Sequence, residues 1–546
     1  MQLKRILVPV IIGAAAAAAS VTAFVSFDAD SIRTDAGGYA ETSAVIAVSQ
    51  TTEASSSVTT TASSAATTVT SASSSAKKTS ASTKKTTAKT AESSAAKKTT
   101  KKTVSGTASA EKSVEKTTTT VMAALEIQKV ETTTTKKTTA KKKTTTTAAK
   151  KTEKATATTT PAPEEILPEG MVKTETGSGR VIINYSQQKA MWVSLFELES
   201  MMKGQSESQF RYNFEQLCRN CSSLGINTLY VHARGLGDAF YESKLFPWSE
   251  YASGKVGRSP GYDPFKIITQ TAHSYDLSVH AWINPFRCGT PSEMSATPDG
   301  YLIKQWYNDP DRYLEFVSYS EFYGKYWLNP GIGSVRSLIA KGVKELVSGY
   351  DIDGIHIDDY FYPTEETWFD EATYRNYYMA GGKLSLRDWR LWNCTQTVKG
   401  IYDTVKAENS ALVFGIAPQG NYENNYNYMF ADVALWLSQP GYCDYLAPQI
   451  YFGYENPWKP FANTLAQWAS LPRDKSVSLV IGIAAANMEL NDEYYGDVGI
   501  IARQIRDSFS YGAGTAIYRY DSLFAPAEGY GYRAARETEE IRQALK

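Results

Sequence analysis

From Val181 to the C-terminus, a short apolar stretch, a loop and an amphipathic stretch with helical spacing follow one another eight times. This alternation predicts a parallel β-sheet, because each helix that connects two parallel strands covers one face of the sheet. Eight such units within about 365 residues are typical of a (β/α)8 barrel. The alternative, a doubly wound open sheet, normally carries a glycine-rich phosphate turn after its first strand, and the sequence has none there. The apolar stretches are AMWVSLF, NTLYVHA, LSVHAWIN, DGIHID, ALVFGIA, DYLAPQIY, SVSLVIGIA and GTAIYRY.

The 546 residues divide by composition into three parts. Residues 1–30 combine Lys4 and Arg5 with an apolar stretch, which predicts a secretory signal peptide, or a membrane anchor if the segment stays uncleaved. Residues 31–175 are rich in Ser, Thr, Ala and Lys and are expected to form a disordered linker, because they contain too few apolar side chains for a core. Residues 176–546 contain the predicted barrel.

Charge is distributed unevenly along the chain. Its 57 basic and 57 acidic residues balance, yet the segment from Lys77 to Thr160 has 20 lysines against 6 glutamates, a net charge of +14 that leaves −14 for the remainder. We expect the lysines of the linker to contact anionic polymers of a cell wall. The lysine-rich segment lacks interleaved arginine and aromatic residues, which argues against a nucleic-acid partner. The protein is therefore expected to be secreted or held at the cell surface, on the extracytoplasmic side.

The cysteines do not indicate a disulfide framework or a metal site, because there are only five of them. Cys218 and Cys221 form a C-x-x-C pair, but they follow the helical spacing of Phe210, Phe214 and Leu217. No second C-x-x-C or histidine pair completes a set of zinc ligands. We expect ordinary helix cysteines, no metal and no cofactor.

The fourth predicted strand ends in two adjacent acids, Asp358 and Asp359, which three aromatic residues follow. Active sites of (β/α)8 barrels lie at the C-terminal ends of the strands. Side chains two residues apart share one side of a strand. We therefore expect Asp358 to point into the barrel mouth near Arg234, and Ile355 and Ile357 to face the helices. By the same rule His232 with Arg234, His280 with Asn284, and His356 with Asp358 share the inward side.

Carboxylates among aromatic side chains suit glycoside hydrolysis. One acid protonates the leaving oxygen, the other acts as nucleophile or base, and aromatic faces stack on sugar rings. The long segments Gly235–Gly261 and Pro285–Gly331, rich in aromatic residues, are expected to form the substrate cleft. The expected catalytic residues are Asp358, Asp359 and Glu423, with Asp238 as a further candidate for the second carboxylate. The expected substrate-binding residues are Arg234, Asp238, His280, Trp282, Asn284, Arg287, His356, Tyr360, Gln419, Gln449 and Tyr451.

Several stretches resemble the family-10-like glycosyl hydrolases of bacteria, a group that includes a divisome-associated enzyme cutting the glycan strands of peptidoglycan. They include GINTLYVHARGLGDAFYESKLFPWSEY, VHAWINPFR, DGIHIDDYFYP, FGIAPQG and DYLAPQIYFGYENP, and they cover the whole predicted barrel. The resemblance implies a (β/α)8 fold and action on a glycan. The stretch GIHID also resembles the strand of alpha-amylase-type barrels whose last residue is the nucleophile, which places Asp358 in that position. The acid that those enzymes carry after strand five has no match here, since FGIAPQG ends at Gln419 and Gly420, and Glu423 is the nearest carboxylate.

The sequence thus predicts an exported glycosidase that cleaves a cell-envelope or extracellular polysaccharide, with peptidoglycan glycan strands favoured. Two alternatives stay open. One is a glycan-binding barrel without turnover. The other is a metal-dependent polysaccharide deacetylase, which also uses paired aspartates but needs a downstream H-x-x-x-H motif that this chain lacks.

Overall fold

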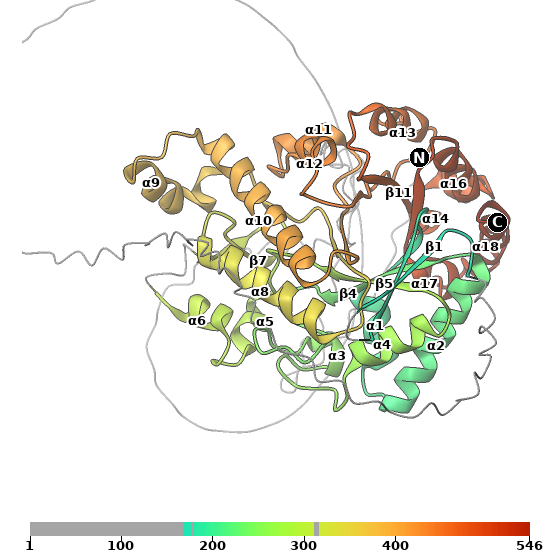
Figure 1. The fold of residues 1–546 in the computed structure, drawn as a ribbon, viewed down its shortest axis with the longest axis horizontal. Coiled ribbons are helices and arrows are strands. Elements are labelled where there is room, and N and C mark those ends of the chain that lie inside the picture. Colours follow the sequence, from blue (N-terminus) through green and yellow to red (C-terminus); the bar gives the residue numbers. More distant parts are fainter. Residues whose placement is uncertain (1–166, 177–178, 311–315) are drawn as a thin grey trace, which may run out of the picture. The chain divides into compact units, whose positions relative to one another are not determined.

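A computed structural model describes residues 167–546 with the exception of 177–178 and 311–315 (Figure 1). The expected signal or anchor segment, residues 1–30, and nearly all of the expected linker lie outside the described residues. Within the described part of the chain, no helix is both long enough and apolar enough to cross a membrane.

Eight parallel strands close into a barrel with the order β10-β11-β12-β3-β4-β5-β8-β9, which confirms the predicted (β/α)8 fold. Each strand overlaps one of the eight apolar stretches. The strands are β3 (Lys189–Val193), β4 (Thr228–Arg234), β5 (Ser278–Ile283), β8 (Gly354–Ile357), β9 (Val413–Ile416), β10 (Tyr445–Leu446), β11 (Ser478–Ala484) and β12 (Gly514–Tyr518).

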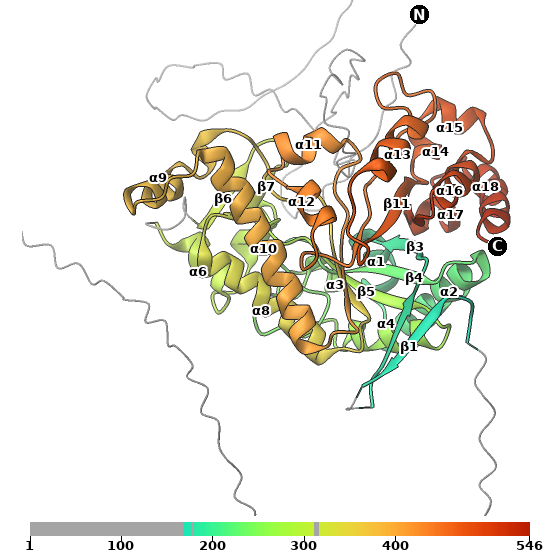
Figure 2. The ribbon, with the colours of Figure 1, turned by 45° about the horizontal axis from the view of Figure 1, so that its top comes forward.

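Helices surround these strands and cover their outer faces (Figures 1 and 2). Some of them begin where the sequence supplies a cap: Asp263 caps α4 through its side chain, and Pro264 occupies the first position, as predicted. Among the described residues the helices are α1 (Leu195–Met202), α2 (Glu207–Leu224), α3 (Glu250–Ser253), α4 (Pro264–His273), α5 (Pro291–Ala296), α6 (Leu302–Asn308), α8 (Gly333–Gly349), α9 (Glu371–Met379), α10 (Leu386–Glu408), α11 (Tyr422–Asn427), α12 (Val433–Ser438), α13 (Phe461–Ser470), α14 (Asn487–Leu490), α15 (Asp492–Gly496), α16 (Ile500–Ser510), α17 (Tyr520–Phe524), α18 (Gly531–Ala544) and the 3-10 helix Thr367–Phe369.

Two antiparallel hairpins lie outside the barrel and were not predicted. The first, β1 (Met171–Glu175) and β2 (Val181–Tyr185), meets the N-terminal end of the barrel, where the Ile183 amide donates to Asp353 just before β8. The second, β6 (Val317–Ser320) and β7 (Lys325–Leu328), lies within the segment that follows β5. Short strands in segments with loop-like composition carry little periodic signal, which is why the sequence pattern missed them.

The core has two layers, one between strands and helices and one inside the barrel. Ile355 and Ile357 belong to the outer layer, as predicted. The inner layer contains large aromatic side chains, including Tyr230 and Tyr445. Gly415 makes room for them, because a Cβ atom at this position would lie 1.9 Å from the Tyr445 ring.

All five cysteines are buried and unpaired. Cys218 and Cys221 lie on the buried face of α2, together with Phe210, Phe214 and Leu217. Their placement agrees with the prediction that they are ordinary helix cysteines.

Candidate active site

A small pocket opens at the C-terminal ends of the strands, with about 350 Å³ of empty space when its open mouth is included. Two aspartates that follow β8 line it together with a glutamine and five aromatic residues. The eight lining residues are Trp192, Trp282, Asp358, Asp359, Tyr360, Gln449, Tyr451 and Tyr518. Six of them are among the fourteen predicted site residues, so the structure brings part of the expected site together.

Asp358 is buried at the pocket and is hydrogen-bonded on one side only. Its Oδ2 accepts from Trp282 Nε1 at 3.1 Å and from Asn284 Nδ2. Among the described residues its Oδ1 has no hydrogen-bond partner and is itself buried, so it is an unsatisfied polar atom beside the pocket. Burial raises the pKa of Asp358 well above its usual value, and the charge of Asp359 raises it further; the Arg287 charge and the two hydrogen bonds oppose this.

Asp359 follows Asp358 in the chain and accepts hydrogen bonds from other side-chain amides. Its Oδ1 accepts from Gln449 Nε2 at 3.1 Å. Burial raises the pKa of Asp359, while hydrogen bonds from Gln449 and Gln419 and the charge of Arg287 oppose the rise. Because the Asp359 charge raises the pKa of Asp358, the two carboxyl groups titrate as an interacting pair.

The cation near this pair is Arg287 and not Arg234, which corrects the sequence-based expectation. A β-bulge shifts the register of β4 between His232 and Arg234, so the two side chains do not share one side of the strand. The Arg234 guanidinium is buried over the Phe246 ring, 4.4 Å from its centroid. The Arg287 guanidinium lies 4.3 Å from the centroid of the pocket residue Tyr360.

A chain of hydrogen bonds orients Asn284 toward the acid. The Leu195 amide donates to His232 Nδ1 at 2.9 Å, so the proton of this neutral imidazole is on Nε2. The His232 Nε2–H then donates to Asn284 Oδ1 at 3.1 Å, which leaves the Asn284 amide group to donate to Asp358. The His232 ring also stacks on Trp282 with centroids 3.4 Å apart. His232 therefore fixes both donors of Asp358.

His280 and His356 lie in the barrel interior and do not line the pocket, which corrects their expected role in substrate binding. Both contact the Tyr445 hydroxyl through Nδ1, at 2.8 and 2.9 Å. Trp192 Nε1 donates to His356 Nε2 at 3.2 Å. Burial lowers the pKa of His280 to about 3 and that of His356 well below its usual value, so both imidazoles are neutral. They support the floor of the pocket from below.

Two predicted carboxylates lie apart from the pair. The Asp238 carboxylate accepts from the Leu236 amide at 2.9 Å and lines a separate small cavity. Glu423 is half exposed on α11 and binds Lys459 Nζ at 2.7 Å and Gln467 Nε2 at 2.9 Å. The Lys459 hydrogen bond lowers the pKa of Glu423, as expected for a surface ion pair. We therefore keep Asp359 as the candidate for the second carboxylate.

The sequence analysis missed three residues at or near the pocket. Trp192 and Tyr518 line it, and the strand alternation used for Asp358 would have found both, since they lie two residues after inward-facing alanines. Tyr323, in the turn between β6 and β7, lies close enough to the pair that the Asp359 charge, second to burial, raises its pKa. Its position depends on the unpredicted hairpin.

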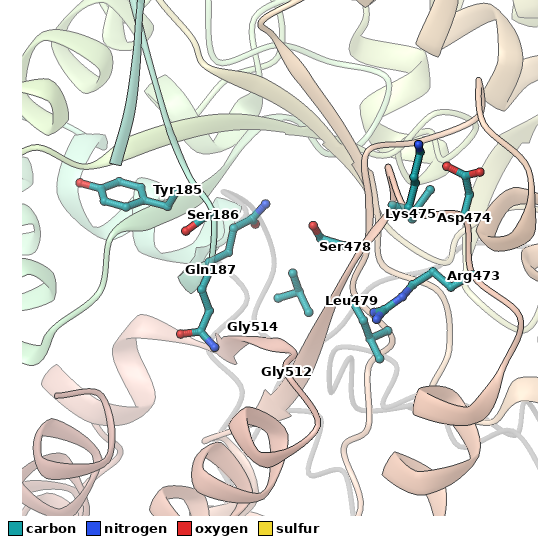
Figure 3. A pocket seen from close by; sticks show the side chains of 13 residues that line it. Tyr185, Ser186, Gln187, Arg473, Asp474, Lys475, Ser478, Leu479, Gly512 and Gly514 are labelled. Atoms are coloured by element: carbon teal, nitrogen blue, oxygen red, sulfur yellow. The ribbon is translucent and has the colours of Figure 1, made fainter. Parts of the chain in front are cut away.

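A larger hollow lies at the opposite end of the barrel, at the N-terminal ends of β11 and β12. Figure 3 shows Tyr185, Ser186 and Gln187 on one side of it and Arg473, Asp474 and Lys475 on the other. None of the predicted site residues lines it. Because the N-terminal end of such barrels serves stability, we place the active site at the C-terminal pocket.

No group of three or more His, Cys, Asp or Glu side chains within the described ranges is arranged to hold a metal ion. The pocket contains a pair of acids with raised pKa values, aromatic faces and amide donors. These groups define a barrel suited to acid–base chemistry on a sugar. The chain belongs to the glycosyl hydrolase-like 10 family, whose model matches residues 190–495. The expected resemblance is thereby confirmed, together with membership in a family of glycoside hydrolases.

Two curated relatives bear names of the same kind. Glycosyl hydrolase YngK of Bacillus subtilis (strain 168) is 33% identical over 342 residues, which cover 58% of this chain and 64% of YngK. Glycosyl hydrolase DigH of Escherichia coli (strain K12) is 32% identical over 334 residues, which cover 56% of this chain and 74% of DigH. The chain thus spans less than two thirds of YngK. A solved PgaB (BpsB) glycoside hydrolase domain from Bordetella bronchiseptica is 13% identical, with a TM-score of 0.45 over 66% of this chain and 99% of that domain, and nothing about function follows from so low a score.

Proposed function

We propose that this chain is an exported glycosidase that cleaves a cell-envelope polysaccharide, with peptidoglycan glycan strands as the favoured substrate. The observation that carries the proposal is the adjacent pair Asp358 and Asp359, both in one pocket and both with raised pKa values. Glycoside hydrolysis needs one carboxyl group that is protonated at working pH and another that is ionised. A coupled pair that shares one proton supplies both states.

The two acids differ in burial, and this difference assigns their roles. Asp358 is only 4% exposed, whereas Asp359 is intermediate, so the shared proton resides on Asp358 in the resting state. Asp358 then donates this proton to the glycosidic oxygen as the bond to the sugar carbon breaks. Asp359 acts as the nucleophile or as the base for water, and the proton released from water restores the pair. This order reverses the roles implied by the likeness to alpha-amylase-type barrels.

The choice of a cell-envelope glycan is supported by features outside the pocket. The apolar N-terminal segment favours export, and the lysine-rich linker favours contact with anionic wall polymers. The resemblance of the barrel to enzymes that act on peptidoglycan glycan strands points to the same substrate. The aromatic residues around the acids suit a sugar polymer in general.

The test is incubation of the purified chain with intact and with peptide-stripped peptidoglycan, followed by mass spectrometry of the products. We expect soluble oligosaccharides with new reducing ends, more from the stripped material if the peptides hinder access. Retained binding to the wall material without any product would instead favour a glycan-binding barrel. Release of acetate that a chelator abolishes would favour a deacetylase.

The assigned roles have their own test, in which Asp358→Asn and Asp359→Asn act on aryl glycosides with good and poor leaving groups. A variant that lacks only the general acid keeps activity on the good leaving group, because its departure needs no proton. We expect this behaviour from Asp358→Asn. The same behaviour from Asp359→Asn would exchange the two roles without affecting the proposed activity.

A further inference from the structure

Aromatic contacts lead from the pocket to the surface. The Tyr360 ring, which lines the pocket, lies 6.0 Å from the ring centroid of Tyr323. Tyr323 in turn contacts Phe322, with centroids 4.8 Å apart and planes at 86°. Both residues belong to the turn that joins β6 and β7, and Phe322 is 64% exposed. A large apolar ring thus faces solvent two ring contacts away from Tyr360, which lines the pocket together with the acids.

The hairpin that carries Phe322 is held firmly against the barrel rim. The Trp327 indole is buried and donates to the Phe361 carbonyl at 2.8 Å, just after the two acids in the sequence. Backbone hydrogen bonds join β7 to the segment that follows β5, at Phe286, Cys288 and Gly289. Phe322 is therefore exposed on an anchored element, where a fixed ring can receive a ligand at low entropic cost.

A second exposed ring stands on the loop between β10 and α13. Trp458 is 85% exposed, an unusual fraction for tryptophan. Its loop is also held, since the amides of Trp458 and Lys459 donate to Asn456 Oδ1 at 3.0 and 2.8 Å and the Lys459 ammonium binds Glu423. Loops that follow barrel strands lie at the C-terminal rim, so Trp458 is at the same end of the barrel as the acids.

The two rings occupy different parts of this rim. Phe322 belongs to the segment after β5 and Trp458 to the loop after β10, and two strands, β8 and β9, separate β5 from β10 in the barrel. The pocket itself is lined by residues of both strands or their ends, Trp282 from β5 and Gln449 after β10. The exposed rings therefore lie in two different sectors of the rim that carries the pocket.

We propose that Phe322 and Trp458 are sugar-binding subsites on two sides of the cleavage pocket, which makes the substrate an extended glycan cut internally. This inference rests on the proposed glycosidase function. The apolar faces of sugar rings stack on aromatic side chains, and a rigid polymer can meet both rings while one of its bonds lies at Asp358. A chain that removed single terminal sugars would need the pocket alone.

The test uses oligosaccharides of increasing length, from disaccharide to octasaccharide, prepared from peptide-stripped peptidoglycan. For the wild-type chain, kcat/KM should rise with length and level off once both subsites are filled. Phe322→Ala and Trp458→Ala should each lower kcat/KM for the longest oligosaccharides by roughly fivefold to tenfold and leave the shortest one within about twofold. Tyr532→Ala, which removes a ring that is 77% exposed on the outer helix α18, is the matched control and should change neither.

Unchanged length dependence in both variants would overturn the inference, and so would an equal loss at every length. If the wild-type chain cleaves none of the oligosaccharides, the proposed function has failed. The affinity of the Asp358→Asn chain for the same series then decides the inference separately: affinity that rises with length and falls in the ring variants supports the subsites, and affinity independent of length or of the rings refutes them.

Discussion

Two buried aspartates flank the same strand and are held in opposite ways. Asp353, just before β8, accepts from the Ile183 and Val279 amides, both at 2.7 Å, and from His273 Nε2 at 2.8 Å. Asp358, just after β8, keeps Oδ1 without a partner in the described part of the chain. The carboxylate whose oxygens are all bound ties the hairpin, β5 and α4 together, whereas the other carboxylate keeps one oxygen without a partner beside the pocket. Burial alone thus does not distinguish a structural acid from a functional one. The distinction lies in whether both carboxylate oxygens accept hydrogen bonds.

The largest expected effect is on activity and comes from Asp358, at the C-terminal end of β8. Asp358→Asn should lower the rate of glycan cleavage by at least about 10³-fold, because the proton donor is lost while the side-chain shape is kept. Release of reducing ends measures the rate, and thermal unfolding should show a chain that is no less stable than wild type. Near-normal cleavage by this variant would remove the contrast between the two aspartates.

The next largest effect is on stability and comes from Asp353, at the N-terminal end of β8. Asp353→Ala should lower the free energy of unfolding by about 3 kcal/mol, because buried donors lose their acceptor. Urea unfolding measures this loss. Asp351→Ala is the control: this side chain is 62% exposed and forms a 3.6 Å ion pair with Arg180, so its removal should cost at most about 0.5 kcal/mol. A fall in cleavage by folded Asp353→Ala, without loss of stability, would contradict the structural role.

A smaller effect should follow from the chain of hydrogen bonds behind Asp358. His232→Ala should lower kcat about tenfold with little change in KM, because Asn284 loses the donor that orients its amide. His232→Gln carries both an acceptor and a donor and should recover part of kcat, whereas His232→Met, which is similar in size but cannot donate to Asn284, should not. Equal kcat in the Gln and Met variants, or a loss that appears only in KM, would refute the positioning role.

The smallest expected effects are on the pH dependence of stability. At both ends of β8, the contribution to stability is lost as pH rises. The raised pKa of Asp358 means that the folded chain binds its proton more tightly than the unfolded chain, so stability is lost as pH rises from about 4 toward the folded pKa. Asp358→Asn should therefore stabilise the chain at neutral pH and have little effect near pH 3. Thermal unfolding of both chains across pH measures the difference, and a constant difference would contradict the buried proton.

At the N-terminal end, burial would lower the pKa of His273, but the hydrogen bond and the charge of Asp353 outweigh it and raise the pKa. The stability from this pair is complete below about pH 6.5 and is lost as pH rises through the folded pKa. His273→Gln should cost more stability at pH 5.5 than at pH 8.5, as measured by urea unfolding. An equal cost at the two pH values would show that the charge of His273 contributes nothing.

The comparison also explains what the sequence could and could not predict. The eight strands, the cap of α4 and the position of Asp358 follow from periodicity and local signals, which act over a few residues. The bulge between His232 and Arg234 breaks that periodicity without leaving a mark that pattern analysis uses. The separation of Asp238 and Glu423 from the acids depends on how loops fold back, and Tyr323 reaches the acids through a hairpin in an aromatic-rich segment. Contacts between distant segments are not encoded in spacing.

The bulge in β4 also determines where the positive charge of the site comes from. Because Arg234 is turned away, the strand itself presents no cation to Asp358 and Asp359. That charge is supplied from outside the sheet, by Arg287, whose backbone pairs with Trp327 of β7. A small displacement of this hairpin would alter the electric field at both acids while every barrel strand stayed in place, so sequence changes remote from the carboxylates can retune their acidity.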